Sequence, residues 1–267
     1  MRHRRIAPLF VSHGAPTMVT EESPATAALR RIGEESPQPA AILAVSAHWI
    51  TPSPTFAAAR RPATLHDFRG FPRSLYEFDY PAPGAPDIAR RGAELLEAAG
   101  MAASLDEERG RDHGVWSPLA LIYPMADVPT TQVSLAASLD PSFHYRMGEA
   151  LAPLAAQGVL ILASGGATHN LSAADPTGAG GAPSWAMEFD AWLEETLTTG
   201  DIDALLDYRN RAPGLATAHP TEEHLTPLFV AAGAAGGAIM AERLVTAFSW
   251  GSLSLATYRL STPYDHL

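Results

Sequence analysis

The chain has 267 residues, of which 46% are hydrophobic and 18% charged, which suffices for a substantial core and excludes a disordered chain. A net charge of −11 without any basic cluster argues against nucleic-acid binding, which needs concentrated positive charge. There is no Cys, which excludes thiol nucleophiles, disulfides and Cys-based metal sites, and no Lys, which excludes Schiff-base chemistry.

Short apolar runs predict the strands of a buried sheet. They cover residues 6–11, 40–47, 131–136 and 159–164, followed near the end of the chain by 243–249 and 253–260. Nearly continuous apolar strands are typical of a sheet covered on both faces. We expect the last two runs to pair as antiparallel neighbours, because only a short turn at Trp250 and Gly251 separates them.

Helical segments alternate with these runs. The predicted helices span residues 86–99, 141–157, 184–199 and 222–235. Gly100 suits the position just past a helix end, and Asp140 with Pro141 is a favourable N-cap and first helical residue. The alternation predicts an α/β fold, a helix-sheet-helix sandwich forming a single domain over residues 1–267, with a mostly parallel or mixed central sheet.

A Pro- and aromatic-rich insertion lies between residues 51 and 85 and has weak periodicity. Loops of this length in a compact domain usually cover a site or an interface, so we expect a substrate wall or a subunit contact here. Arg69, Phe71 and Tyr76 are candidates to contact a ring or a carboxylate, and simple packing is the alternative.

Targeting and catalytic motifs are mostly absent from the sequence. No apolar stretch approaches the roughly 20 residues that a membrane span needs, and residues 6–11 are too short for a signal peptide. There is no G-x-S-x-G, no G-x-G-x-x-G after a strand and no H-E-x-x-H. We expect a soluble, cytoplasmic protein, monomeric or homo-oligomeric, that binds neither nucleic acid nor a membrane.

Three histidines follow predicted strands. His13 and His48 come directly after theirs, and His169 comes shortly after residues 159–164, beyond a Gly-Gly pair. In open α/β sheets ligands bind beyond the carboxyl ends of the strands, so parallel strands would bring the three imidazoles into one crevice. A single histidine after a strand is more often an ordinary hydrogen-bonded residue, so the prediction depends on the threefold recurrence.

Two further histidines, His113 in a loop and His224 at the start of a predicted helix, complete the candidate set. Without Cys, a transition metal needs converging imidazoles or carboxylates, and His13, His48 and His224 are the best candidate ligands. Nitrogen donors suit iron(II), zinc, copper and nickel, so ligand type leaves the metal open.

Six segments occur in order along the chain: PLFVSHGAPTM, ILAVSAHW, HDFRGFPRSLYEFDYPAPG, DHGVWSPL, ASGGATHNL and HPTEEHLTPL. Together they resemble the class III extradiol ring-cleavage dioxygenases of the LigB-like superfamily, in particular the 4,5-DOPA extradiol dioxygenase branch, over about residues 6–260. The resemblance implies a non-haem iron(II) enzyme that opens the ring of a small catechol with O2, with zinc as a possible bound metal.

The resemblance also implies a role for each histidine. His13, His48 and His224 would be metal ligands. His169 would be the catalytic acid/base residue, close enough to the metal to coordinate it. His113 would be a second catalytic residue that contacts the substrate or the ligands.

Several alternatives stay open. Ring-cleaving members of the wider superfamily often use two histidines and one carboxylate, and Glu222 or Glu223 would then compete with His224. Zinc in the same pocket would favour a metal-dependent hydrolase, because zinc activates water rather than O2. A third alternative is a non-enzymatic binding module of the LigB-like type, although the presence of all five histidines favours an enzyme.

Overall fold

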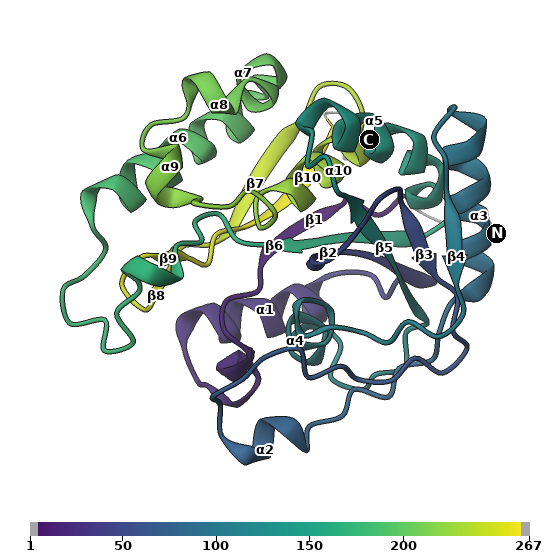
Figure 1. Cartoon of the computed structure of the whole chain (residues 1–267), viewed down its shortest axis with the longest axis horizontal. Helices are drawn as coiled ribbons and strands as arrows, with labels where there is room; N and C mark the ends of the chain where they lie inside the picture. The colour runs from purple at the N-terminus through teal and green to yellow at the C-terminus, as the bar shows by residue number, and fades with distance from the viewer. Residues whose placement is uncertain (1–4, 263–267) are drawn as a thin grey trace.

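The structure is a computed structural model that describes residues 5–262, and it confirms the α/β fold with a mixed central sheet between helical layers (Figure 1). The main sheet has eight strands in the order β4-β3-β5-β2-β6-β1-β10-β7. These strands are β1 (Leu9–Ser12), β2 (Ala41–Thr51), β3 (Thr55–Ala57), β4 (Ser104–Asp106), β5 (Thr130–Ala136), β6 (Val159–Gly165), β7 (Met240–Val245) and β10 (Thr257–Ser261). A separate two-stranded ladder joins β8 (Phe248–Ser249) and β9 (Leu253–Ser254).

Helices cover both faces of this sheet (Figure 1). They are α1 (Pro24–Glu35), α2 (Arg73–Tyr76), α3 (Pro86–Ala98), α4 (His113–Ile122), α5 (Pro141–Ala155), α6 (Ser184–Thr199), α7 (Ile202–Leu206), α8 (Tyr208–Arg211), α9 (Leu215–Ala218) and α10 (Thr226–Ala235). Two short 3-10 helices are η1 (Pro16–Thr20) and η2 (Leu171–Ala173). No helix within residues 5–262 has the length and apolar character required to cross a membrane.

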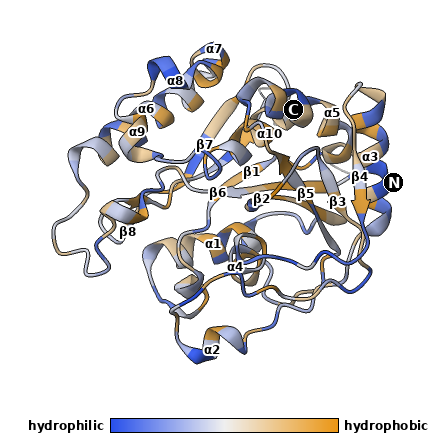
Figure 2. Ribbon diagram, in the orientation of Figure 1, coloured by the Kyte–Doolittle hydropathy of each residue, from blue (hydrophilic) through white to orange (hydrophobic). Residues whose placement is uncertain are grey.

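The apolar strands are buried on both sides, as their composition predicts. In β2, Ile42 and Ala44 pack into the core under α1 and α4, whereas Leu43 and Val45 pack into the core with α3, α5 and α10. This alternation follows from the two-residue repeat of a strand. Figure 2 accordingly shows hydrophobic colours on the central strands and α10, while the peripheral α8 is hydrophilic.

The carboxyl ends of the central strands meet at one edge. β1 and β2 both run parallel to β6, with Ser12 opposite Gly165 and Ser46 opposite Ser164. The ladder continues past β1, because the His13 backbone N–H donates to the Gly165 carbonyl at 3.0 Å. The parallel arrangement needed to gather the histidines is therefore present.

An irregularity in β2 lies at this same edge. Val45 pairs with Val133 and Ile50 with Leu135 of β5, so the four residues 46–49 stand opposite Ser134 alone. Extra residues of this kind kink a strand and redirect its side chains. His48 lies within this bulge, inside β2 rather than after it, and its ring turns toward the site.

The predicted helices over 86–99, 141–157 and 184–199 correspond to α3, α5 and α6, and Asp140 caps α5 by accepting the Phe143 N–H. Two expectations were wrong in detail. The helix predicted from residue 222 begins at Thr226, next to Pro227, which suits a helix start. His113 begins helix α4 instead of lying in a loop. The last two apolar runs pair antiparallel as predicted, with the pairing divided into a β7–β10 ladder and a β8–β9 ladder.

Candidate metal centre

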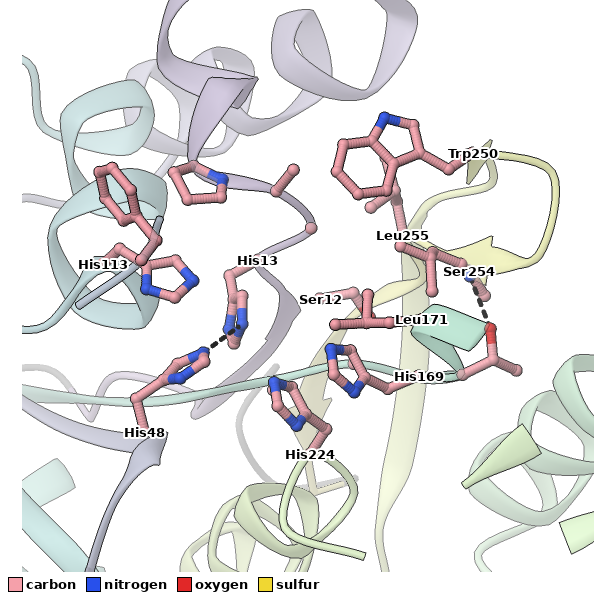
Figure 3. Close-up of a pocket in the computed structure, with 18 of the residues that line it drawn as sticks. Ser12, His13, His48, His113, His169, Leu171, His224, Trp250, Ser254 and Leu255 are labelled. Atoms are coloured by element: carbon pink, nitrogen blue, oxygen red, sulfur yellow. Dashed lines mark hydrogen bonds between the residues drawn. The ribbon is translucent and has the colours of Figure 1, made fainter. Parts of the chain in front are cut away.

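The structure brings all five predicted histidines together. His13 follows β1, His48 lies in the β2 bulge, His113 begins α4, His169 follows β6, and His224 precedes α10. All five line one cavity of about 300 Å³ at the carboxyl edge of the sheet (Figure 3).

Their rings are in mutual contact. The His13 and His48 ring centroids are 4.9 Å apart, and those of His48 and His224 are 5.0 Å apart. His113 lies 4.1 Å from His48, and His169 stacks on His224 at 3.4 Å with an interplanar angle of 7°. Five imidazoles this close are stable only if most of them are neutral, because like charges would repel.

Hydrogen bonds at Nδ1 assign the tautomers of three of the rings. The Ser164 hydroxyl donates to the Gly114 carbonyl, so its oxygen accepts from His13 Nδ1–H at 2.9 Å. His224 Nδ1–H donates to Glu223 Oε1 at 2.9 Å. His113 Nδ1–H donates to Asp67 Oδ1, also at 2.9 Å. Because burial also holds the pKa of His13 and of His224 well below 6.5, these two rings present an unprotonated Nε2, the state that metal binding requires.

The Nε2 atoms fit a divalent metal ion. His13 Nε2 lies 3.0 Å from His48 Nε2, and two nitrogens each about 2.1 Å from one ion at a right angle would be about 3.0 Å apart. His224 Nε2 is buried and has no hydrogen-bond partner among the described residues. Buried nitrogens without partners are costly in a protein interior, and coordination would satisfy them.

Two donor groups have all their ligand atoms within 4.8 Å of one another. One consists of His13, His48 and His113, and the other of His169, Glu223 and His224. The groups are neighbours, since His224 contacts both His13 and His48. The predicted ligand set of His13, His48 and His224 takes members from each group.

The two candidate carboxylates differ. Glu222 points to Arg209, with Oε2 2.6 Å from the guanidinium, and this ion pair keeps it out of the cluster. Glu223 accepts from the His224 ring and belongs to the second donor group. Of these two carboxylates, only Glu223 lies near the ring nitrogens of the histidine cluster.

Burial keeps the imidazoles neutral. Desolvation, followed by the neighbouring histidines, holds the pKa of His13 and of His224 well below the usual 6.5. Desolvation also lowers the pKa of His48 and of His169 to about 4. At neutral pH these side chains are therefore available as ligands and as proton acceptors.

Asp67 is a candidate site residue that the sequence did not indicate. Its Oδ1 accepts from both the backbone N–H and the ring of His113, each at 2.9 Å, and its Oδ2 lies 3.6 Å from His48 Nδ1. Burial alone would raise the pKa of Asp67, but the hydrogen bonds from His113 outweigh it and bring the pKa to about 2. The carboxylate therefore orients two imidazoles; the only sequence signal was an acidic residue next to His66 in the HDF segment.

A buried hydrogen-bond network holds the backbone at His48. Asp112, fully buried, accepts from Ser46 Oγ at 2.6 Å and from Arg109 at 3.2 Å. Ser46 Oγ in turn accepts the His48 backbone N–H at 3.2 Å. The hydrogen bonds from Arg109 to Asp112 and from Ser46 to Asp112 thus fix the backbone of the β2 bulge.

Glycines allow the backbone to approach the cluster closely. A Cβ at Gly114 would lie 2.5 Å from Ser46 Oγ and 3.0 Å from the His48 ring. A Cβ at Gly165 would lie 2.0 Å from the His224 carbonyl oxygen. Only glycine fits at these two positions, which explains the small residues beside the histidine motifs.

The insertion forms part of the cavity wall, as predicted. Phe68 and Phe71 line the cavity, whereas Arg69 and Tyr76 do not. Tyr76 packs against Phe68 and His66 instead, with ring centroids 5.1 Å and 6.1 Å away. For Tyr76, the packing alternative is the one that the structure supports.

Comparison with known proteins gives a consistent result. The family described as the catalytic LigB subunit of aromatic ring-opening dioxygenase matches residues 7–258. A protein of Beta vulgaris named 4,5-DOPA dioxygenase extradiol is 44% identical over 257 residues, covering 95% of this chain and 96% of the relative. A protein of the same name from Escherichia coli K12 is 37% identical, covering 97% and 96%.

A solved structure is also similar. The crystal structure of an uncharacterized protein from Escherichia coli K12 superposes with a TM-score of 0.81 at 34% sequence identity. The match covers 96% of this chain and all of that one. The similarity in fold therefore extends over nearly the whole chain.

Proposed function

The chain belongs to the LigB family of aromatic ring-opening dioxygenases, and we propose that it is an extradiol dioxygenase that uses iron(II) and O2 to open the ring of a small, DOPA-like catechol. In this proposal residues 1–267 act as one catalytic domain. The observation that carries it is the convergence of His13, His48 and His224, with His13 Nε2 3.0 Å from His48 Nε2 and their rings in contact with that of His224.

We assign the metal to His13, His48 and His224. The short distance between His13 and His48 Nε2 and the unpartnered His224 Nε2 support this choice. His169 lies against His224 and is close enough to become a further ligand, while His113 is turned toward the cavity by Asp67. When bound, iron(II) supplies the redox chemistry with O2 and acidifies the catechol hydroxyls.

The protein side chains move the protons. His169 is neutral because burial lowers its pKa to about 4, so it can accept a proton from a catechol hydroxyl at neutral pH. It then returns that proton during ring opening, which leaves the overall reaction a simple addition of O2 to the catechol. His113 accepts a hydrogen bond from the substrate through Nε2, while Asp67 prevents the ring from turning.

The walls of the cavity keep water away from the reacting groups. Phe68, Phe71 and Leu255 are among the residues that line it. Excluding water strengthens the electrostatic interactions inside the cavity and protects reactive species from side reactions.

Oxygen uptake by the iron-loaded protein tests the proposal. Protein loaded with iron(II) without air, then mixed with a catechol and O2, should consume one O2 per catechol and form a yellow semialdehyde. With ¹⁸O2 both labelled atoms should enter the product. Hydrolysis of an ester or amide by the zinc-loaded protein, without any need for O2, would contradict the proposal and favour a hydrolase.

A further inference from the structure

One wall of the cavity is carried by a very short hairpin, residues 248–254, which we call the wall hairpin. Its strands β8 and β9 are joined by two residue pairs. Trp250, Leu253 and Ser254 of this hairpin line the cavity, and in Figure 3 Trp250 lies on the opposite side of the cavity from His48. An isolated two-stranded hairpin is marginally stable at best in water, so contacts outside the hairpin must hold this wall in place.

The hydroxyl of Thr168 makes two of these contacts. Its Oγ1 donates to the Ser252 carbonyl oxygen and accepts the Ser254 backbone N–H, both at 2.7 Å. The second of these bonds is the dashed line at Ser254 in Figure 3. Because all three residues are only 1% exposed, water has no access to replace either bond. One buried hydroxyl therefore satisfies two backbone groups of the wall hairpin.

A second anchor ties the wall hairpin to other elements. The Ser254 hydroxyl donates to Asp190 of α6 at 2.5 Å, and Asp190 pairs with Arg243 of β7 at 2.7 Å. Both charged side chains are less than a tenth exposed. This ion pair connects the hairpin to α6 and β7, whereas Thr168 connects it to the segment that carries His169. The position of the wall relative to the proposed acid/base residue therefore depends on the Thr168 hydroxyl.

The segment that carries Thr168 is itself firmly held. The Ala167 N–H donates to Ser12 Oγ, and the His169 N–H donates to the Ala218 carbonyl oxygen, each at 2.9 Å. The same backbone carries the His169 ring, which lines the cavity. A segment held in this way gives the wall hairpin a fixed position relative to the side chains that act on the substrate ring.

Resting on the proposed ring-opening function, we propose that Thr168 is a positioning residue that sets substrate selectivity. Its hydroxyl holds the wall hairpin against the side chain of a DOPA-like catechol while the ring lies at the histidine cluster. A catechol held by its two hydroxyls at the cluster directs its ring substituent toward the opposite wall, where Trp250 lies. An unsubstituted catechol lacks the group that meets this wall, so its binding does not depend on Thr168.

Thr168→Val tests the proposal through binding, without turnover. Valine keeps the shape of threonine but leaves the Ser252 carbonyl and the Ser254 N–H buried and unpaired, so the hairpin should move. Calorimetry of the iron-loaded protein under nitrogen would compare L-DOPA with unsubstituted catechol. The Kd for L-DOPA should rise by at least about tenfold, which corresponds to about 1.4 kcal/mol and is typical of one unpaired buried group. The Kd for catechol should stay within about threefold, and kcat/KM in air should follow the same split.

Two further variants separate the hydroxyl from general packing. Thr168→Ser keeps the hydroxyl and should bind L-DOPA within about threefold of the unmodified protein. Thr130→Val is the matched control, because Thr130 is also 1% exposed and also donates to a backbone carbonyl, that of Val128 at 3.0 Å. Thr130 begins β5, at the edge of the sheet away from the cavity, so its replacement should leave both Kd values unchanged. Metal affinity should stay the same in all three variants, since none of them displaces a proposed ligand.

Hydrogen exchange of the unmodified protein keeps the proposal testable if Thr168→Val fails to fold. The Ser254 amide should exchange at least about 100-fold more slowly than an unprotected amide, because it donates to a buried hydroxyl. Exchange near the unprotected rate would overturn the inference. Equal weakening of L-DOPA and catechol by Thr168→Val, or weak binding of L-DOPA that Thr168→Ser does not restore, would also overturn it.

The outcomes separate this inference from the function on which it rests. A loss of binding that is selective for L-DOPA, in a protein that takes up no O2 with any catechol, would support the role of Thr168 and refute the dioxygenase function. Oxygen uptake with both catechols and no selective loss would support the function and refute the role of Thr168. Absence of binding by either catechol to the unmodified protein would refute both.

Discussion

Replacing Gly165 with Ala should displace His224 and release the metal. A Cβ at Gly165 would lie 2.0 Å from the His224 carbonyl oxygen, whereas real Cβ atoms essentially never come closer than 3.0 Å. The backbone at His224 must therefore move by about 1 Å. The Gly166 N–H donates to the same His224 carbonyl oxygen at 2.9 Å, so this hydrogen bond would be disturbed as well. Metal–ligand distances tolerate only about 0.2 Å.

The expected magnitude is a loss of about 100-fold in metal affinity, the upper end of the effect of removing a group that orients a ligand. Competition with a chelator of known affinity measures this constant directly. Circular dichroism of the metal-free variant separates a local displacement from failure to fold. His224→Ala, which removes the imidazole without a backbone clash, should show a comparable loss.

Gly166→Ala is the matched control at the adjacent position. Its Cβ would lie 3.3 Å from the Thr168 carbonyl oxygen and 3.6 Å from the His169 Cβ, contacts that small shifts can relieve. We expect its metal affinity to stay within about threefold of the unmodified protein, because no predicted ligand is displaced. Metal affinity and turnover of Gly165→Ala equal to those of Gly166→Ala would refute the placement of His224 among the ligands.

Three further predictions concern proton transfer, ring orientation and pH. His169→Ala should keep its metal, but its rate of ring cleavage should fall by about 100-fold or more, because general acid–base catalysis contributes about that much. Unchanged turnover would reject His169 as the acid/base residue. Asp67→Ala should lower kcat about 10–100-fold, because the His113 ring would be free to turn. Asp67→Asn keeps an acceptor oxygen and should lower kcat less. Equal kcat values for the two variants would argue against an orienting role. Desolvation lowers the pKa of His219 from 6.5 to about 4 in the folded protein, so the unfolded chain binds the proton first and stability falls as pH drops below 6.5. Between pH 7 and pH 5 this side chain should remove about 2 kcal/mol of stability, and His219→Gln should unfold in urea with a correspondingly weaker pH dependence; an unchanged pH dependence would contradict the buried neutral state.

The sheet and its histidines were predictable because their signals are local. Apolar runs gave the strands, and His13 and His48 stand directly beside them in sequence. The two-sided burial of β2 follows from the same composition, and β2 pairs with β6 in parallel, the arrangement on which the prediction of one crevice depended. The meeting of the strand ends then brings together imidazoles that are far apart in sequence.

Helix α4 was missed because its sequence lacks helical periodicity. Nearly every residue in it is buried, so no polar face produces a 3.6-residue pattern, and Pro118 lies inside it. Its role is to carry His113 into the site, and the partner of that ring, Asp67, is 46 positions away. Spacing in sequence gives no indication of such a contact.

The β2 bulge is the second feature that required the structure. The run AAILAVSAHW predicts a regular strand, yet residues 46–49 leave the β5 register and present His48 to the cavity. The cause is a tertiary network in which Ser46 bonds to the buried Asp112. A local pattern cannot report a hydrogen bond to a residue 66 positions away.

The most direct test of the central claim is anomalous diffraction from crystals of the iron-loaded protein, collected at the iron edge. We predict a single peak about 2.1 Å from the Nε2 atoms of His13, His48 and His224. An iron peak at another site, with these three imidazoles left without metal, would contradict the account.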